Sequence, residues 1–182
     1  MLARIMKKLS VIALFIMLVI MLSGSFTHAQ QADVTGRSSD VKVTFHKSKT
    51  YIGDHSGKAA ARVCGQTDPM YFGHKGFVFE YPLDLPPNDP IEDVRFSSDE
   101  LIDGIKSTKK FHLSVTVSSP AMGHPNALVI NTEDPNTGAN GKADISGNGK
   151  ELKIIVTGSN SLAEEVEVVI TCGPAPKKTT NN

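Results

Sequence analysis

The stretch Glu164-Glu165-Val166-Glu167-Val168-Val169-Ile170-Thr171-Cys172 decides the fold class of this chain. Apolar side chains occupy every second position from Val166 to Cys172, which is the pattern of a β-strand with one buried face. Gly173-Pro174 ends the strand directly after the cysteine. We expect this stretch to be the last strand of an all-β domain.

The same alternation recurs along the chain in short segments. The clearest are Val41–His46, Phe77–Tyr81, Phe111–Val117 and Glu151–Thr157. Turn residues separate these segments, and Gly147-Asn148-Gly149 is typical of a hairpin tip. About nine short strands without a long helix predict an antiparallel β-sandwich, with an immunoglobulin-like or a jelly-roll arrangement.

Four other segments carry local signals. Gly53–Gly57 has the composition of a turn, and the prolines of Pro82–Pro90 predict an extended crossing from one sheet to the other. Ile91–Phe96 is expected to be an edge strand. Ser97-Ser98-Asp99-Glu100 has the spacing of a helix capping box, which predicts one or two helical turns over Leu101–Ile105.

The first residues have the layout of an export signal. Arg4, Lys7 and Lys8 precede an apolar run from Leu9 to Leu22, and Thr27-His28-Ala29 places small residues before a cut after Ala29. The run is shorter than the ~20 residues that a membrane span needs. We expect a cleaved signal peptide and a mature protein in the periplasm or outside the cell; an uncleaved N-terminal anchor is the alternative.

The domain organisation follows from these boundaries. We expect a signal peptide at 1–29, a flexible leader at 30–40, one β-sandwich domain at 41–173 and a flexible tail at 174–182. Without the signal, the chain has 16 basic and 19 acidic residues and a net charge of −3 with His neutral. No basic face is concentrated enough for nucleic acid, and the charge equally disfavours an electrostatic membrane binder.

The chain has two cysteines, Cys64 and Cys172. Two cysteines in an exported protein indicate a disulfide, whereas redox pairs and metal thiolates more often show close spacing such as C-x-x-C. The disulfide would close a loop of more than one hundred residues. In the simplest chain-entropy model this stabilises the fold by about 4–5 kcal/mol.

Two Met/His pairs are candidate metal ligands. Met70-x-x-x-His74 and Met122-Gly123-His124 both lie in predicted loops, and thioether with imidazole suits copper, especially the reduced ion. Loops at one end of a sandwich could bring the pairs together, with His46 or His112 added from a strand. The alternative is that the methionines fill gaps under their loops and the histidines are ordinary surface residues.

A second candidate site is the segment Asp134–Gly141, flanked by Glu133 and Asp144. Its oxygen ligands suit calcium. The position of the glutamate that closes a helical calcium loop is taken by Asp144, inside a predicted strand. Turn chemistry explains the same composition.

Catalysis has little support. The chain has no Gly-x-Ser-x-Gly elbow, and the acids near the prolines form a glycosidase pair only if two of them face each other. Tyr71-Phe72 is a loop aromatic pair that could contact a glycan or anchor its loop. The acids are Asp84, Asp89, Glu92 and Asp93.

The expected function is therefore that of an exported, non-catalytic binding or structural module without a bound cofactor. Its partner would be a protein or glycan at the cell exterior, met by the loops around Tyr71-Phe72, Met122–His124 and Asp134–Asn140. A periplasmic copper-binding protein is the first alternative. A hydrolase of extracellular polymers is a weaker one.

Overall fold

The computed structural model describes residues 35–48, 51–67, 75–86, 88–102, 104–118, 126–148 and 150–174. The chain divides into two units, Met1–Asp33 and Val34–Asn182, and all described residues belong to the second. The expected signal peptide and most of the expected tail lie outside them.

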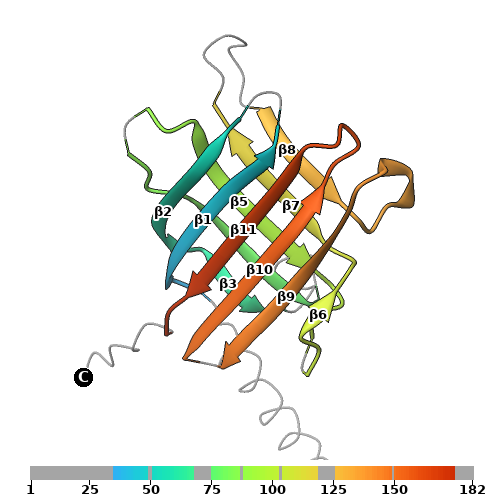
Figure 1. Cartoon of the computed structure of the whole chain (residues 1–182). Coiled ribbons are helices and arrows are strands. Elements are labelled where there is room, and N and C mark those ends of the chain that lie inside the picture. Colours follow the sequence, from blue (N-terminus) through green and yellow to red (C-terminus); the bar gives the residue numbers. More distant parts are fainter. Residues whose placement is uncertain are drawn as a thin grey trace, which may run out of the picture. The chain divides into compact units, whose positions relative to one another are not determined.

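Six strands form sheet A, in the antiparallel order β2-β1-β11-β10-β9-β6 (Figure 1). β11, the strand expected to be the last, lies in the middle of this sheet between β1 and β10. β1 already begins at Arg37, inside the segment expected to be a leader. The strands are β1 (Arg37–Lys47), β2 (Gly53–Ala61), β6 (Ser107–Thr108), β9 (Asn140–Asn148), β10 (Glu151–Ser159) and β11 (Glu165–Cys172).

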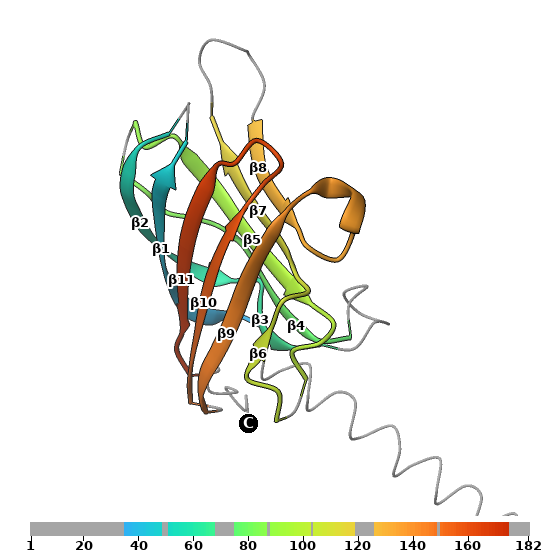
Figure 2. The same cartoon turned by 45° about the vertical axis from the view of Figure 1, so that its right-hand side comes forward.

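Five strands form sheet B, in the antiparallel order β3-β4-β5-β7-β8. Sheet B faces sheet A, so the domain is a two-layer β-sandwich as expected (Figure 2). One short 3-10 helix, η1 (Pro135–Thr137), precedes β9. The strands of sheet B are β3 (Val63–Gln66), β4 (Phe77–Pro82), β5 (Ile91–Ser98), β7 (His112–Val117) and β8 (Asn126–Asn131).

Strands that follow one another directly along the chain within a sheet pair as neighbours, and the chain changes sheets between β2 and β3, on either side of β6, and between β8 and β9. The immunoglobulin-like and jelly-roll arrangements both contain Greek-key connections. In this structure, by contrast, strands that follow one another directly within a sheet are joined as hairpins, and the last strand, β11, lies beside the first, β1. The described residues contain eleven strands, more than the expected nine. β2 and β3 are separated only by Arg62 and belong to different sheets, and β6 has no periodic signal in the sequence.

Three local predictions were wrong. Gly53–Gly57 is part of β2, because its backbone pairs with β1 along its whole length in spite of its turn-like composition. Ile91–Ser98 is the central strand of sheet B, paired on both sides. No helix is found in the described part of Leu101–Ile105. The Thr108 hydroxyl donates a hydrogen bond to the Glu100 carboxylate, and this bond holds the pKa of Glu100 below its ordinary value.

The prediction for Pro82–Pro90 was wrong as well. The strands before and after this segment, β4 and β5, pair with each other in sheet B, so the chain does not change sheets here. The segment does reach sheet A, because Asp84 N donates to Lys58 O of β2 at 3.0 Å. It therefore spans the side of the sandwich and returns.

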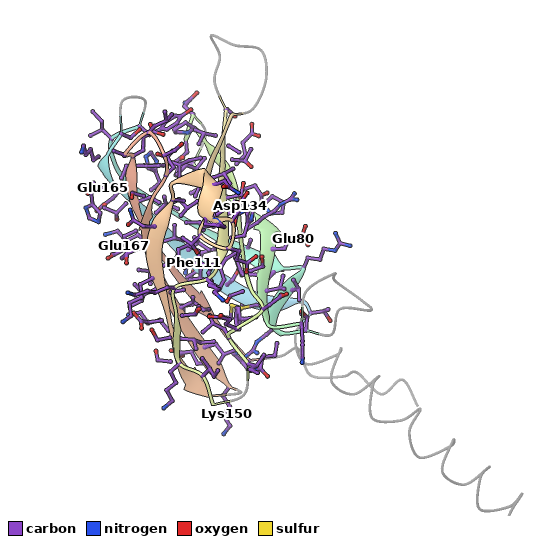
Figure 3. The ribbon with its side chains drawn as sticks, turned by 90° about the vertical axis from the view of Figure 1, so that its right-hand side faces the viewer. Glu80, Phe111, Asp134, Lys150, Glu165 and Glu167 are labelled. Carbon is purple, nitrogen blue, oxygen red and sulfur yellow. A yellow bond between two sulfur atoms is a disulfide. The ribbon has the colours of Figure 1, made fainter. Side chains whose placement is uncertain are left out.

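The core lies between the sheets and consists of the inward side chains of both. Three buried phenylalanine rings lie next to one another in this core. The ring centroid of Phe96 is 6.3 Å from that of Phe77 and 6.0 Å from that of Phe111. Figure 3 shows Phe111 between the layers, while Glu165 and Glu167 point away from sheet A and Glu80 lies on the opposite side. The alternation that the sequence showed is therefore the alternation between core and solvent.

Cys64 and Cys172 form the expected disulfide, and both are fully buried. Cys64 is in β3 of sheet B and Cys172 ends β11 of sheet A, so the bond links the two layers. Arg37, only 3% exposed, lies beside it. Its Nε donates to Gly173 O at 2.6 Å and its Nη1 lies 3.5 Å from Cys64 O, so the guanidinium connects the same two chain segments.

We predict that removal of the disulfide destabilises the domain strongly. The bond joins residues 108 positions apart, so Cys64→Ala with Cys172→Ala should lower the free energy of unfolding by about 4–5 kcal/mol. Urea unfolding of oxidised wild type, reduced wild type and the double variant measures this. The reduced wild type separates loss of the cross-link from loss of sulfur packing. Equal stability of all three would contradict the prediction.

Candidate functional site

The four proposed copper ligands, Met70, His74, Met122 and His124, lie outside the described residues, as does Tyr71-Phe72. The strands that flank them are described. The first pair lies between Gln66 and Phe77, and the second between Val117 and Asn126. Phe77 pairs with Ser98, at one end of β5, and Val117 pairs with Ile91, at the other. The two Met/His segments therefore leave sheet B from opposite ends.

The histidines expected to assist them are also separated. His46 is exposed on the outer face of β1 in sheet A, and His112 begins β7 in sheet B. The described residues contain no group of three or more His, Cys, Asp or Glu side chains that could hold a metal ion.

The oxygen-rich segment Asp134–Asn140 uses its polar atoms within itself. Asp134 caps η1, and its Oδ1 accepts hydrogen bonds from the backbone N and the side-chain Nδ2 of Asn136, both at 2.9 Å. Thr137 Oγ1 donates to Asn131 O at 2.6 Å. Asp144 pairs with Lys142 at 2.8 Å, and this hydrogen bond lowers the pKa of the Asp144 carboxyl. Turn formation accounts for these residues.

The four acids near the prolines have separate partners, and no interaction between two of them is recorded. Asp89 pairs with His55, Glu92 accepts a hydrogen bond from Ser118, and Asp93 accepts one from Arg95. The fourth, Asp84, joins β2 through its backbone. Each carboxylate with a recorded side-chain bond is thus held by a different partner.

The segment between β4 and β5, which we call the strap (residues 83–86 and 88–90), is fastened to β2 at two points. The first is the Asp84–Lys58 backbone bond. The second joins Asp89 Oδ2 and His55 Nδ1, 3.1 Å apart, with side chains only 13% and 15% exposed. Leu83 and Leu85, on either side of Asp84, pack against the core. The strap therefore closes the open side of the sandwich next to β2.

A small polar cluster lies under one end of the strap. The rings of Tyr51 and His55 both contact Phe45, at centroid distances of 5.5 and 5.9 Å. Tyr51 Oη and His55 Nε2 are buried and have no hydrogen-bond partner. This cluster was not predicted, because the sequence of Gly53–Gly57 resembles a turn. The signal that could have found it is the alternation of His55, Gly57, Ala59 and Ala61, which indicates a strand that begins before Lys58.

An open groove of about 600 Å³ lies where the strap meets the outer face of sheet A. Lys58 and Asp40 form an ion pair across it at 3.4 Å, and Lys42 pairs with Asp54 nearby at 3.0 Å. The pKa of the Asp54 carboxyl is lowered mainly by the hydrogen bond from Thr44, with a second contribution from Lys42. The other main lining residues are Ser56, Asp84, Leu85, Pro86, Val169 and Thr171.

The groove combines charges of both signs and hydroxyl groups with a wall whose exposed surface is mostly apolar. Such a lining offers hydrogen-bond donors and acceptors to a polar ligand, and it lacks the enclosed apolar surface that small apolar ligands need. It is the candidate functional site of the described domain. None of its residues was a predicted site residue apart from Asp84.

Comparison with models of protein families, with curated proteins and with solved structures finds no match to this chain. Among the described residues no helix has the length and apolar character to cross a membrane.

We predict that Gly57→Ala loosens the strap. A Cβ at Gly57 would lie 2.6 Å from Leu85 Cδ2 and 3.2 Å from Leu83 Cβ, so the Leu85 side chain must leave its position and the strap at Leu83 must shift slightly. Overpacking of this kind should lower the free energy of unfolding by about 1–3 kcal/mol, measured by urea denaturation. In a Leu85→Ala background the added methyl group should cost less. Strictly additive losses in the double variant would refute the close approach.

Proposed function

We propose that this protein is exported and acts outside the cytoplasm as a non-catalytic binding module of the cell envelope. The observation that carries the proposal is the buried disulfide between the two sheets. Disulfides form and persist in oxidising compartments and are rare where thiols are kept reduced. The N-terminal positive charges and the apolar run that follows them would act as the export signal.

The disulfide supports export because its place in the fold is structural. Cys64 and Cys172 are fully buried and neither cysteine is free, so the pair is not arranged for thiol exchange at the surface. Reactive cysteine pairs are usually accessible and close in sequence. A cross-link of this kind fits a protein that matures after export.

The arrangement of the ionisable groups supports binding rather than catalysis. The acids near the strap are held by separate partners, and the half-buried His55 has Asp89 as its recorded hydrogen-bond partner. General acid–base chemistry needs two such groups directed at one position. The described residues provide a two-sheet scaffold and an open groove bordered by charged side chains instead.

The side chains around the groove support the proposal that its ligand is polar, such as a glycan or an extended peptide. Its lysines, acids and hydroxyl groups project from neighbouring strands, so they form a regular array that an extended polymer can follow. Lys42 and Lys58 are 54% and 84% exposed and lie on adjacent strands. We therefore place the binding surface over β1, β2 and the strap.

Export is tested by the state of the protein made in its own cells. We expect the mature chain to begin at Gln30, to carry an intact disulfide and to be found in the periplasmic or extracellular fraction, as measured by N-terminal sequencing and intact mass. Leu14→Arg with Leu18→Arg, which interrupts the apolar run, should retain a full-length chain with reduced thiols. A wild-type chain found uncleaved and reduced in the cytoplasm would rule out the proposal.

Binding is tested by cosedimentation of the mature protein with isolated cell envelopes. Lys42→Ala with Lys58→Ala should weaken envelope binding at least fivefold, because both lysines border the groove. Lys142→Ala with Lys153→Ala removes the same charge from the same face, but on β9 and β10, and should bind like wild type. Equal binding by all three proteins would show that the groove is not the binding surface.

A further inference from the structure

The two sheets have four edge strands, and three of them are protected against pairing with another chain. The strap covers β2 through the Asp84–Lys58 bond, and its prolines cannot donate a ladder hydrogen bond. β3 has four residues and β6 has two. Short edges and covered edges are two of the ways in which β-proteins avoid association.

The fourth edge strand, β8, has none of these features. Its sequence, Asn-Ala-Leu-Val-Ile-Asn, contains no charge, no proline and no glycine, and it pairs with β7 without a register shift. Leu128 and Ile130 are 5% and 0% exposed and fix the strand to the core, while Val129 is 40% exposed on the outer face. β8 is therefore a straight, firmly held and uncharged edge.

The backbone groups that β8 presents follow from its pairing with β7. Thr132 N donates to Phe111 O, and hydrogen-bonded pairs alternate along an antiparallel ladder. Leu128 and Ile130 therefore bond to β7, and Ala127, Val129 and Asn131 direct their N–H and C=O groups outward. Thr137 Oγ1 already donates to Asn131 O, which agrees with this phase. Within the described part of the chain, Ala127 and Val129 have no recorded backbone partner on that side.

We infer that β8 pairs with β8 of a second copy of this chain to form a two-fold symmetric dimer. Asn131 O already accepts from Thr137, so the antiparallel register that uses the outward groups of Ala127 and Val129 alone places Ala127 opposite Val129 of the second copy, and Val129 opposite its Ala127. This register makes four backbone hydrogen bonds and joins two copies of sheet B into one continuous sheet. It also covers Val129.

Charge explains why the partner is a second copy. Two identical edges normally oppose like charges, and edge lysines prevent association in this way. β8 carries no charge, and the nearest charged side chain in the Val129 row, Arg95, is two strands away and paired with Glu80 and Asp93. An identical strand can therefore approach without electrostatic opposition. The antiparallel two-fold register makes one sequence complementary to itself.

The first experiment measures the mass of the mature protein in solution by sedimentation over a range of concentrations. Wild type should reach the mass of two chains, and Val129→Lys should raise the dissociation constant at least tenfold. Ile155→Lys, the same kind of change on the outer face of β10 in sheet A, should leave the dimer intact. A wild-type monomer at every concentration up to about 1 mM overturns the inference, as does a dimer that Val129→Lys does not weaken.

The second experiment tests the register by cross-linking, because neither native cysteine is free to interfere. A mixture of Ala127→Cys and Val129→Cys proteins should form a disulfide-linked heterodimer on mild oxidation, since opposed residues lie within disulfide reach. Each variant alone should cross-link at least fivefold less. A dimer that gives no mixed cross-link would place the interface elsewhere and overturn the assignment to β8.

Discussion

The disulfide between Cys64 and Cys172 is the constraint on which the rest of this sandwich depends. It joins β3 of sheet B to the end of β11 in sheet A. The inter-layer contact elsewhere consists mainly of non-directional apolar packing, which permits one sheet to slide on the other. Arg37 adds a directional contact at the same place through the carbonyl oxygens of Gly173 and Cys64. These contacts fix the position of one sheet relative to the other at this point. They thereby determine which inward side chains of the two sheets meet.

The strap solves a second problem, at the open side of the sandwich beside β2. β2 is long but contains few large side chains, and the core there would be exposed without cover. Leu83 and Leu85 supply that cover, and Gly57 permits their close approach because it has no Cβ. The same prolines that prevent the segment from becoming a strand also block the β2 edge. The groove above the strap is a consequence of this closure.

The sequence predicted most strands of this fold because one face of each is buried, and alternation records that directly. It failed at β2, where Gly53, Asp54 and Ser56 favour a turn locally and pairing with β1 overrides them. It also failed at β5, since the pattern shows that one face is buried but not whether a strand has neighbours on both sides. The disulfide was predictable from two cysteines in a chain that the sequence led us to expect to be exported. The groove was not, because its residues come from four separate segments and share no spacing.

The copper hypothesis shows how topology restricts a site that sequence alone leaves open. In an antiparallel meander the connections alternate between the two ends of a sheet, so two loops share an end only if an even number of strands of that sheet separates them. Three strands of sheet B, β4, β5 and β7, lie between the Met70/His74 segment and the Met122/His124 segment. The two pairs therefore leave opposite ends of the sheet, and four ligands from one end are not available. The odd number of intervening strands therefore argues against coordination of one copper ion by all four Met and His side chains of a single domain. The surfaces that remain for binding are formed by strands: the outer face of sheet A and the β8 edge of sheet B.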